Sequence, residues 1–248
     1  MVGARLLPDR GLLKLREANM QRRKLIGLVL GCATAALAGP VLAAAPETWD
    51  GLTRVKSKKL GVVYLQPGAD FSGYKKVIVD PTEVSFEKDW ARNYNRTQRG
   101  VSGKISDADV EKTVQQSAMA ATDIFAQAFT RAGYQVVKDA GPDVLRVRTL
   151  IFNVSVSAPD VQTAGRTTSF AGEAGQASLV VEARDSETGA LLGRGVDRKV
   201  AGDNFTTLRN SVTNRADFNA LVRSWADASA KGLTELKALP RVEAAAGK

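Results

Sequence analysis

Apolar residues recur at helical spacing in two long segments of the chain. In the first segment, successive apolar positions lie three or four residues apart, which places one apolar stripe on a helix. These positions are Val110, Val114, Ala118, Ala121, Phe125, Ala128 and Phe129. Ser106 and Asp109 form an approximate capping box, and Gly133 suits a C-terminal cap. We therefore predict a helix from about residue 107 to residue 132.

The second segment with helical spacing lies near the end of the chain. Its apolar stripe consists of Phe218, Leu221, Val222, Trp225, Ser229, Leu233 and Leu236. Asn214 is the predicted N-cap of this helix, and Pro240 ends it. Because Trp225 falls within the stripe, we expect it to belong to the core.

Shorter apolar or alternating runs, bounded by turn residues, predict strands. The runs cover residues 60–65, 74–80, 84–86, 144–156, 177–184 and 190–200. Pro81 cannot donate to a sheet ladder, so the strand before it should end there. The phase of the apolar positions shifts within the longest run, which predicts a bulge near Thr149 or Leu150. Residues 185–189 read as the turn of a hairpin between the last two strands.

These elements predict an α+β fold. Two amphipathic helices with one apolar stripe each need a common surface, and a mainly antiparallel sheet with both helices on one face provides it. We expect a single α+β domain over residues 44–240 and a disordered tail over residues 241–248.

Residues 20–43 have the pattern of a signal peptide. A basic run at residues 20–24 precedes an apolar run at residues 25–37, and small residues follow. We predict cleavage after Ala43, or one or two residues later, and export to the periplasm without a remaining transmembrane span. An uncleaved anchor is the alternative. Residues 1–19 resemble an upstream extension rather than part of the fold.

Two finer features of the leader leave alternatives open. Arg22-Arg23 resembles a twin-arginine export signal, although paired basic residues also occur in ordinary secretory leaders. Residues 29–32, Val-Leu-Gly-Cys, resemble a lipobox that would lipidate Cys32 and associate the protein with a membrane. Leu30 is bulky where a small residue is preferred, so cleavage after Ala43 is favoured over lipidation.

The charge of the chain is unevenly distributed. The formal net charge is +9. Residues 1–43 carry seven Lys or Arg and two Asp or Glu, so the remainder has 28 basic and 24 acidic residues and a net charge of +4. A mildly basic domain of this kind does not require nucleic acid, and we expect no nucleic-acid partner.

The chain lacks histidine, and its single cysteine is Cys32, in the leader. The predicted mature chain therefore lacks the residues for a Ser-His-Asp or Cys-His nucleophile system and for a disulfide. It also lacks the usual zinc ligands. We predict no catalytic residues, no metal and no cofactor, while a calcium or magnesium site built from oxygen atoms alone stays open.

The segment from Phe86 to Arg99 combines aromatic and basic residues. Its candidate partner-binding residues are Trp90, Arg92, Tyr94, Arg96 and Arg99. If the segment is helical, the two aromatic residues share a face, as do the first two arginines. Rings beside arginines suit contact with an acidic envelope protein or an anionic envelope polymer. The alternative is that the rings fold back onto the sheet and the arginines are solvated.

Three smaller groups of charged residues have both a structural and a functional interpretation. They are the basic trio Lys56, Lys58 and Lys59, the strand pair Glu182 and Arg184, and the carboxylates Glu83 and Glu87. The trio is either a solvated surface or an anion-binding patch. The strand pair forms either an ion pair or the wall of a groove. The two carboxylates would serve a glycosidase-like site only if they converge.

Several spaced pieces of the chain resemble one bacterial family. They are Trp49-Asp-Gly-Leu52, Tyr64-Leu-Gln-Pro-Gly-Ala-Asp-Phe71, Tyr74-Lys-Lys-Val77, Asp80-Pro81, Phe86-Glu-Lys-Asp-Trp90 and Tyr94-Asn95. The chain is similar to the family called domain of unknown function 3313, whose members are mostly predicted exported proteins and lipoproteins. The resemblance implies no catalytic residues.

Three functions are compatible with these patterns. We favour a periplasmic or envelope-associated binding or assembly module without catalytic activity. The alternatives are a carboxylate-dependent envelope hydrolase and a purely structural subunit of an envelope complex.

Overall fold

The computed structural model describes residues 45–97, 104–156, 169–171, 175–201, 207–209 and 211–239. The chain divides after Ala44, and every described residue belongs to the second unit, Ala45–Lys248. The predicted leader with Cys32, the predicted tail and Arg99 lie outside the described residues. Their predicted boundaries therefore stay predictions.

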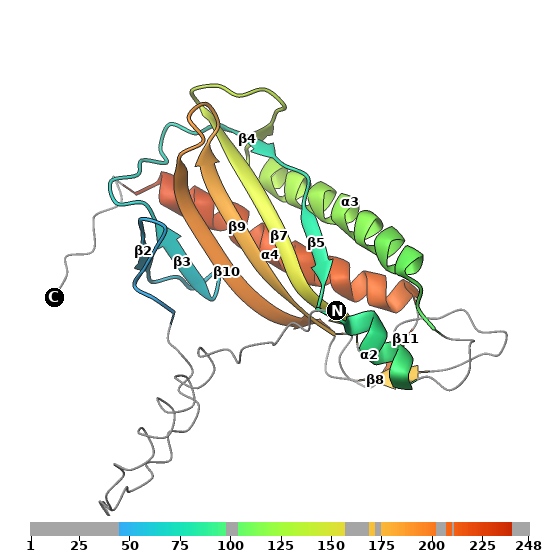
Figure 1. Cartoon of the computed structure of the whole chain (residues 1–248). Helices are drawn as coiled ribbons and strands as arrows, with labels where there is room; N and C mark the ends of the chain where they lie inside the picture. Colours follow the sequence, from blue (N-terminus) through green and yellow to red (C-terminus); the bar gives the residue numbers. More distant parts are fainter. Residues whose placement is uncertain are drawn as a thin grey trace, which may run out of the picture. The chain divides into compact units, whose positions relative to one another are not determined.

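Within the described residues, one large sheet of nine strands forms the centre of the fold (Figure 1). Its strands are β1 (Thr48–Trp49), β2 (Leu52–Val55), β3 (Val62–Leu65), β4 (Lys76–Val79), β5 (Glu83–Phe86), β6 (Gln135–Val136), β7 (Val144–Val156), β9 (Gly175–Asp185) and β10 (Leu191–Ala201). Their order is β1-β2-β3-β10-β9-β7-β4-β6, and β5 also pairs with β7. A separate small sheet joins β8 (Ser169–Ala171) to β11 (Thr207–Arg209).

The large sheet is mixed but mainly antiparallel. The ladders from β1 through β2, β3, β10 and β9 to β7 are antiparallel, whereas β4 and β5 pair with β7 in parallel, as β6 does with β4. β4 ends at Val79, before Pro81, and the chain resumes as β5. The predicted α+β class is therefore confirmed.

Two long helices, α3 (Asp107–Arg131) and α4 (Ser211–Lys237), cover one face of the sheet (Figure 1). At the start of α3, the Ser106 hydroxyl accepts a hydrogen bond from the Asp109 amide, and the Asp109 carboxylate accepts one from the Ser106 amide. The predicted capping box is thus confirmed. The predicted N-cap of the second helix is wrong, because α4 begins at Ser211 and Asn214 lies inside it. The residues before Phe218 are mostly polar, and several of them could begin a helix. Because the apolar stripe begins only at Phe218, it does not fix the first residue of α4.

A further helix, α2 (Trp90–Thr97), occupies part of the segment from Phe86 to Arg99, for which the sequence left helical structure open. Most of its side chains are polar, so the pattern of apolar positions does not reveal this helix. Asn95 ties α2 to the residue before the N-cap of α3: its side-chain amide group hydrogen-bonds both the amide and the carbonyl of Ile105, each at 2.8 Å.

The bulge in β7 lies further along the strand than predicted. The register with β9 shifts between Phe152 and Ser155, and Asn153 has a φ of 51°. Thr149 is buried on the helix-covered face, so the ladder is regular where the bulge was expected. Leu150 and Phe152 consequently point to the open face, the face of the sheet that α3 and α4 do not cover.

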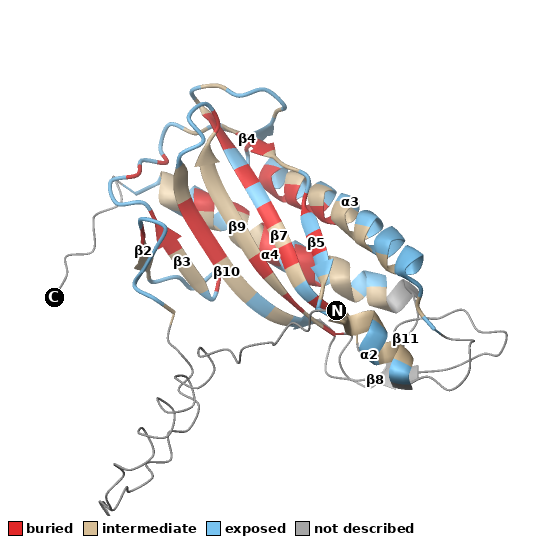
Figure 2. Cartoon of the chain, in the orientation of Figure 1, coloured by how far each residue is buried: buried red, intermediate tan, exposed pale blue. Residues whose placement is uncertain are grey.

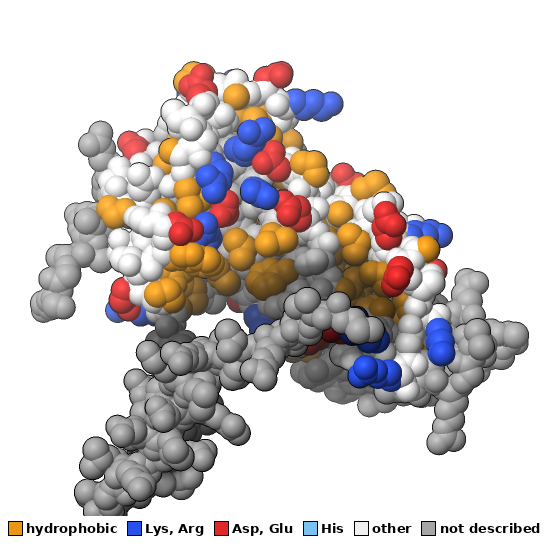
Figure 3. Space-filling view, in the orientation of Figure 1, with side chains coloured by type: hydrophobic (Ala, Val, Ile, Leu, Met, Phe, Trp, Pro, Cys, Tyr) orange, Lys and Arg blue, Asp and Glu red, His pale blue; other side chains and the backbone are white. Residues whose placement is uncertain are grey.

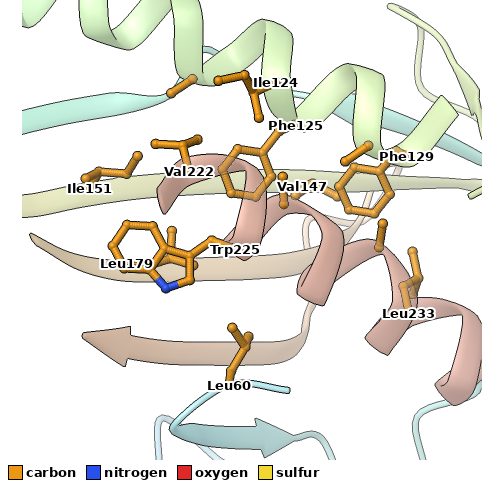
Figure 4. Close-up of a cluster of buried hydrophobic side chains, with 14 of the residues drawn as sticks. Leu60, Ile124, Phe125, Phe129, Val147, Ile151, Leu179, Val222, Trp225 and Leu233 are labelled. Atoms are coloured by element: carbon orange, nitrogen blue, oxygen red, sulfur yellow. The ribbon is translucent and has the colours of Figure 1, made fainter. Parts of the chain in front are cut away.

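The core lies between the sheet and the two long helices (Figure 2). Trp225 of α4 has no exposed surface and lies against the sheet near Leu179, with Phe125 of α3 and Val222 alongside (Figure 4). The Trp225 indole Nε1 donates a 2.9 Å hydrogen bond to Asp197 Oδ2, which pairs the one polar atom of this ring. The prediction that Trp225 belongs to the core is confirmed.

None of the helices in the described part of the chain is long and apolar enough to span a membrane.

Candidate functional site

An apolar cavity lies between the sheet and the C-terminal half of α4. Its volume is about 480 Å³, within the range of about 300–1,000 Å³ that is usual for small-molecule sites. Its walls come from β3, β7, β9, β10, α3, α4 and the connection between β3 and β4, and include Leu65, Phe71, Phe129, Leu145, Val147, Val181, Ala183 and Leu233. Most of these side chains belong to the hydrophobic core, so the cavity reaches into the interior of the fold.

Glycines line this space on both facing elements, but their surroundings differ. A Cβ atom at Gly195 of β10 would lie 2.5 Å from Leu60 Cδ1, and one at Gly193 would lie 3.0 Å from Leu65 Cδ2. On the helix side, a Cβ atom at Gly232 would meet nothing within 4 Å. The two strand glycines therefore make room for the side chains of Leu60 and Leu65, whereas open space lies next to Gly232 on the helix.

The loop between β2 and β3 forms the mouth of the cavity. Lys56, Ser57, Lys58 and Lys59 line it from the loop, and Glu235 and Leu239 line it from the end of α4. The Ser57 hydroxyl accepts hydrogen bonds from the amides of Lys59 and Leu60, at 3.1 and 3.3 Å. This turn fixes the loop backbone and sends Leu60 inward, where it is 9% exposed, while the lysines stay outside.

The polar groups at the mouth are predominantly basic. Lys59 Nζ lies 3.1 Å from Glu235 Oε1, which links the loop to α4. Lys56 and Lys58 are exposed on the same loop. The structure therefore places the basic trio that the sequence singled out at the entrance of an apolar cavity.

On the open face of the sheet, behind the cavity, charged residues form an ion-pair cluster. Arg194, which is 8% exposed, reaches Glu182 Oε1 and Asp50 Oδ2, each at 2.7 Å, and its Cζ lies 4.2 Å from the centre of the Trp49 ring. Glu182 also pairs with Arg184 at 2.8 Å. Burial raises the pKa of Glu182, but the hydrogen bonds from Arg194 and Arg184 outweigh it and hold that pKa below its usual value. The strand pair thus forms the predicted ion pair.

Apolar side chains continue the open face beside this cluster. Val62 of β3 pairs with Val196, Val196 with Val180, and Val180 with Leu150, and all of them are partly exposed. Figure 3 shows hydrophobic side chains gathered next to the basic and acidic ones on this face. The charged side chains of the ion-pair cluster pair with one another.

The carboxylate of Glu83 is also engaged in an ion pair. Arg148 Nη2 lies 2.6 Å from Glu83 Oε1, and both side chains are more than half exposed. Glu87 follows the end of β5 and is exposed. Within the described residues, no group of three His, Cys, Asp or Glu is close enough to hold a metal ion.

The candidate residues around α2 lie at the other end of the sheet from the cavity mouth (Figure 1). Phe86, Trp90 and Tyr94 stack in a row, with ring centres 4.5 and 6.3 Å apart. The Trp90 indole donates to the Val156 carbonyl at 3.3 Å, and burial raises the pKa of Tyr94. The structure therefore brings the two aromatic residues together as a half-buried row.

The two arginines of this segment that the structure describes differ in their contacts. Arg92 pairs with Asp89 at 2.8 Å, and Arg96 is exposed. Arg99 lies outside the described residues. That these residues bind a partner stays a prediction.

Sequence reasoning missed the cavity, although it placed three of its lining residues, Phe129, Leu233 and Leu236, in the helical stripes. The available signal was the occurrence of Gly193 and Gly195 on one face of a strand, together with Gly232 in the middle of a helical stripe. Glycine is unfavourable inside helices and strands by roughly 0.5–1 kcal/mol relative to alanine, so its presence there calls for a packing reason.

Solved structures are similar to the chain at low sequence identity. A PelC dodecamer from Paraburkholderia phytofirmans is 13% identical, with 72% of this chain and 98% of that chain covered and a TM-score of 0.35. Protein XCC0632 from Xanthomonas campestris is 10% identical, with 69% and 87% covered and a TM-score of 0.35. No curated protein sequence matches the chain.

The family comparison covers most of the chain. The model described as protein of unknown function (DUF3313) matches residues 44–229. This range begins where the predicted leader ends and includes the β2–β3 loop, the sheet, α3 and most of α4. The chain therefore belongs to the DUF3313 family.

Proposed function

We propose that the protein is an exported, envelope-associated binding module that acts without catalysis and holds an apolar ligand in the cavity. The signal-peptide pattern of residues 20–43 supports export to the periplasm. Cleavage after Ala43 would leave the described domain without its apolar leader. Lipidation at Cys32 would instead keep the same domain at a membrane surface.

The cavity is the observation that carries this proposal. Both layers of the fold contribute to its walls, and Leu145, Val147 and Phe129 among them are at most 2% exposed. Protein interiors are otherwise close-packed, with few voids larger than a water molecule. A space of about 480 Å³ with such walls therefore favours an apolar guest.

The cavity also predicts how affinity depends on the length of an alkyl chain. Each buried CH₂ group contributes about 0.8 kcal/mol, which is roughly a fourfold gain in affinity. The gain should continue until the cavity is full and then stop. A non-specific hydrophobic surface would show no such limit.

The test is a titration of the purified protein with octanol, decanol, dodecanol and hexadecanol, followed by amide chemical shifts. We expect affinity to rise roughly fourfold per methylene and then level off, with the largest shifts at Gly193, Gly195 and Gly232. Shifts confined to the open face, or no saturable binding, would contradict the proposal.

The segment around α2 supports a second candidate function, contact with an acidic envelope protein or an anionic envelope polymer. The observation that favours it is the exposure of Arg92 and Arg96 beside the stacked rings of Trp90 and Tyr94. Rings bury area at low entropy cost, and arginine makes forked bonds to anions.

This second function is tested by the double variant Arg92→Ala and Arg96→Ala. Recovery of a partner from detergent-solubilised envelopes should fall, while the free energy of unfolding stays within about 0.5 kcal/mol of the wild type. The matched control is Arg198→Ala, an exposed arginine on the open face that bonds Gln176. Equal recovery with both variants would remove support for this surface.

A further inference from the structure

The charges around the cavity specify which kind of apolar molecule fits it. From them we infer that the ligand is an anionic amphiphile with a single alkyl chain, whose tail occupies the cavity and whose head group lies at the loop of Lys56, Lys58 and Lys59. This inference rests on the proposed binding function and adds the chemical class of the ligand.

The distribution of polarity fixes the orientation of such a ligand. The inner walls are formed by side chains such as Leu65, Phe129 and Val147. Of the charged lining residues, Glu182 and Arg194 pair with each other at 2.7 Å, and the others belong to the mouth. An ionised head group inside these walls would lose its hydration without a compensating partner, which is very costly. The head group therefore stays at the mouth, and the alkyl chain enters.

The sign of the head group follows from the pairing of the mouth residues. Lys59 and Glu235 neutralise each other across the opening at 3.1 Å. Among the residues that the structure describes, this is the one ion pair formed by the lysine trio. Lys56 and Lys58 leave the mouth with a local excess of positive charge, which complements an anion and repels a cation.

The loop geometry strengthens this complementarity. The Ser57 hydroxyl holds the amides of Lys59 and Leu60, so the loop is already folded around the mouth. Leu60 contributes to the cavity wall while its neighbouring lysines stay exposed. One short loop thus supplies both an apolar contact for the tail and cations for the head group, at little ordering cost.

Glu235 gives the inference a test of opposite sign. Its carboxylate lies at the same mouth and would compete with an anionic head group for Lys59. Removing that negative charge should therefore strengthen the binding of an anion, whereas removing lysine charges should weaken it. An effect of overall hydrophobicity would not produce this pair of opposite changes.

The experiment compares four probes with the same twelve-carbon chain, each below its micelle concentration: dodecanoate, dodecyl phosphate, dodecanol and dodecyltrimethylammonium. Binding to the purified protein is measured by calorimetry in 50 mM and 500 mM NaCl. The variants are Lys56→Gln/Lys58→Gln and Glu235→Gln. The control Lys104→Gln/Lys112→Gln removes the same charge from exposed lysines that do not line the cavity.

We expect the Lys56→Gln/Lys58→Gln variant to bind dodecanoate about 3- to 10-fold more weakly than the wild type, as for two partly exposed charge pairs. Dodecanol affinity should change less than twofold. Glu235→Gln should bind dodecanoate roughly two- to threefold more tightly, and the control should match the wild type. High salt should weaken the binding of the two anions, dodecanoate and dodecyl phosphate, and leave dodecanol binding unchanged. The ratio of dodecanoate to dodecyl phosphate affinity tells whether a carboxylate or a phosphate head group is preferred.

The outcomes separate the two proposals. If dodecanol binds and the lysine variant leaves dodecanoate affinity unchanged, the anionic class is wrong and the apolar binding function stands. Preference for dodecyltrimethylammonium would also overturn the anionic class. If none of the four probes binds, the binding function fails and this inference fails with it.

Discussion

The two halves of α4 face the same sheet but fill the space beneath them differently. In the N-terminal half, Val222 and Trp225 pack against Ile151 and Leu179, and all of these side chains are fully buried (Figure 4). We call these four residues the packed half. In the C-terminal half, the facing residues are Ala228 and Gly232 on the helix and Gly193 and Gly195 on β10. We call those four the open half.

The comparison shows that side-chain size, and not a different architecture, creates the cavity. The same helix crosses the same sheet in both halves. Strand β10 borders both of them: its Asp197 accepts the hydrogen bond from Trp225 of the packed half, and two of its glycines belong to the open half. Because helix glycine is unfavourable by about 1 kcal/mol, the open half keeps its space at a cost in stability.

The largest expected effect is on the free energy of unfolding when a buried leucine is truncated. Two leucines without exposed surface are compared: Leu179 of β9, in the packed half, and Leu145 of β7, at the wall of the cavity. Leu179→Ala should cost about 3–5 kcal/mol in the free energy of unfolding. Leu145→Ala should cost about 2–3 kcal/mol, because a side chain beside a void has fewer partner atoms to lose. Urea unfolding of both variants measures the difference. Equal losses would mean that the two halves are packed alike.

A second prediction concerns polar groups in the closely packed region. Thr149 lies two residues before Ile151 on the helix-covered face of β7, and its hydroxyl is 2.6 Å from that of Thr82. Thr149→Val should cost about 1–3 kcal/mol, because the Thr82 hydroxyl would lose its partner in a dry interior. The control is the double variant Thr82→Val/Thr149→Val. If the double variant loses more free energy of unfolding than Thr149→Val does, loss of the hydrogen bond between the two hydroxyls is not the cause of the destabilisation.

The third prediction concerns how substitutions of Gly232, in the open half, change the free energy of unfolding. Gly232→Ala should raise the free energy of unfolding by about 1 kcal/mol through helix propensity. Gly232→Leu should add up to roughly 1–2 kcal/mol more, because its side chain would enter apolar space that lacks atoms within 4 Å of the new Cβ. Thermal unfolding of the two variants gives the comparison. A Leu variant less stable than the Ala variant by 1–3 kcal/mol would indicate overpacking and a closed space.

The smallest effect concerns the ion-pair cluster behind the open half. The pKa of Glu182 in the folded protein lies below its ordinary value of 4.5, so ionised Glu182 stabilises the fold above that pH. This contribution is lost as the pH falls through the pKa of Glu182 in the folded protein. The stability difference between wild type and Glu182→Gln should therefore narrow at acid pH, by about 1 kcal/mol or less. Urea unfolding from pH 7 down to pH 3 tests it, and a constant or widening difference would contradict the assignment.

The packed half could be predicted from the sequence, and the open half could not. The helical stripe that contains Val222 and Trp225 marks the packed half, because large apolar residues at regular spacing identify a buried face. The open half depends on the absence of a side chain at Gly232 and on how Leu65 and Leu60 pack onto Gly193 and Gly195. A pattern of apolar positions does not record volume, so it gives no sign of the space that these residues leave.

Other departures from the sequence predictions have similar local causes. Leu150 and Phe152 are apolar yet lie on the open face, so their phase suggested a bulge before its true place near Asn153. The sequence left the helical state of α2 open, because the hydrogen bond that holds this helix to β7, from the Trp90 indole to the Val156 carbonyl, is tertiary in origin. The lysine trio was recognised as basic, but its position at a cavity mouth depends on how α4 crosses the sheet.

The most direct test of the central claim is the affinity of dodecanol for Gly232→Leu compared with Gly232→Ala, measured by calorimetry at neutral pH. Both variants improve the helix, and they differ only in whether a side chain fills the open half. The account predicts that the Ala variant binds within about threefold of the wild type, while the Leu variant binds at least roughly tenfold more weakly although it is folded and more stable. Equal affinity in the two variants would show that the cavity beneath α4 is not where the ligand binds.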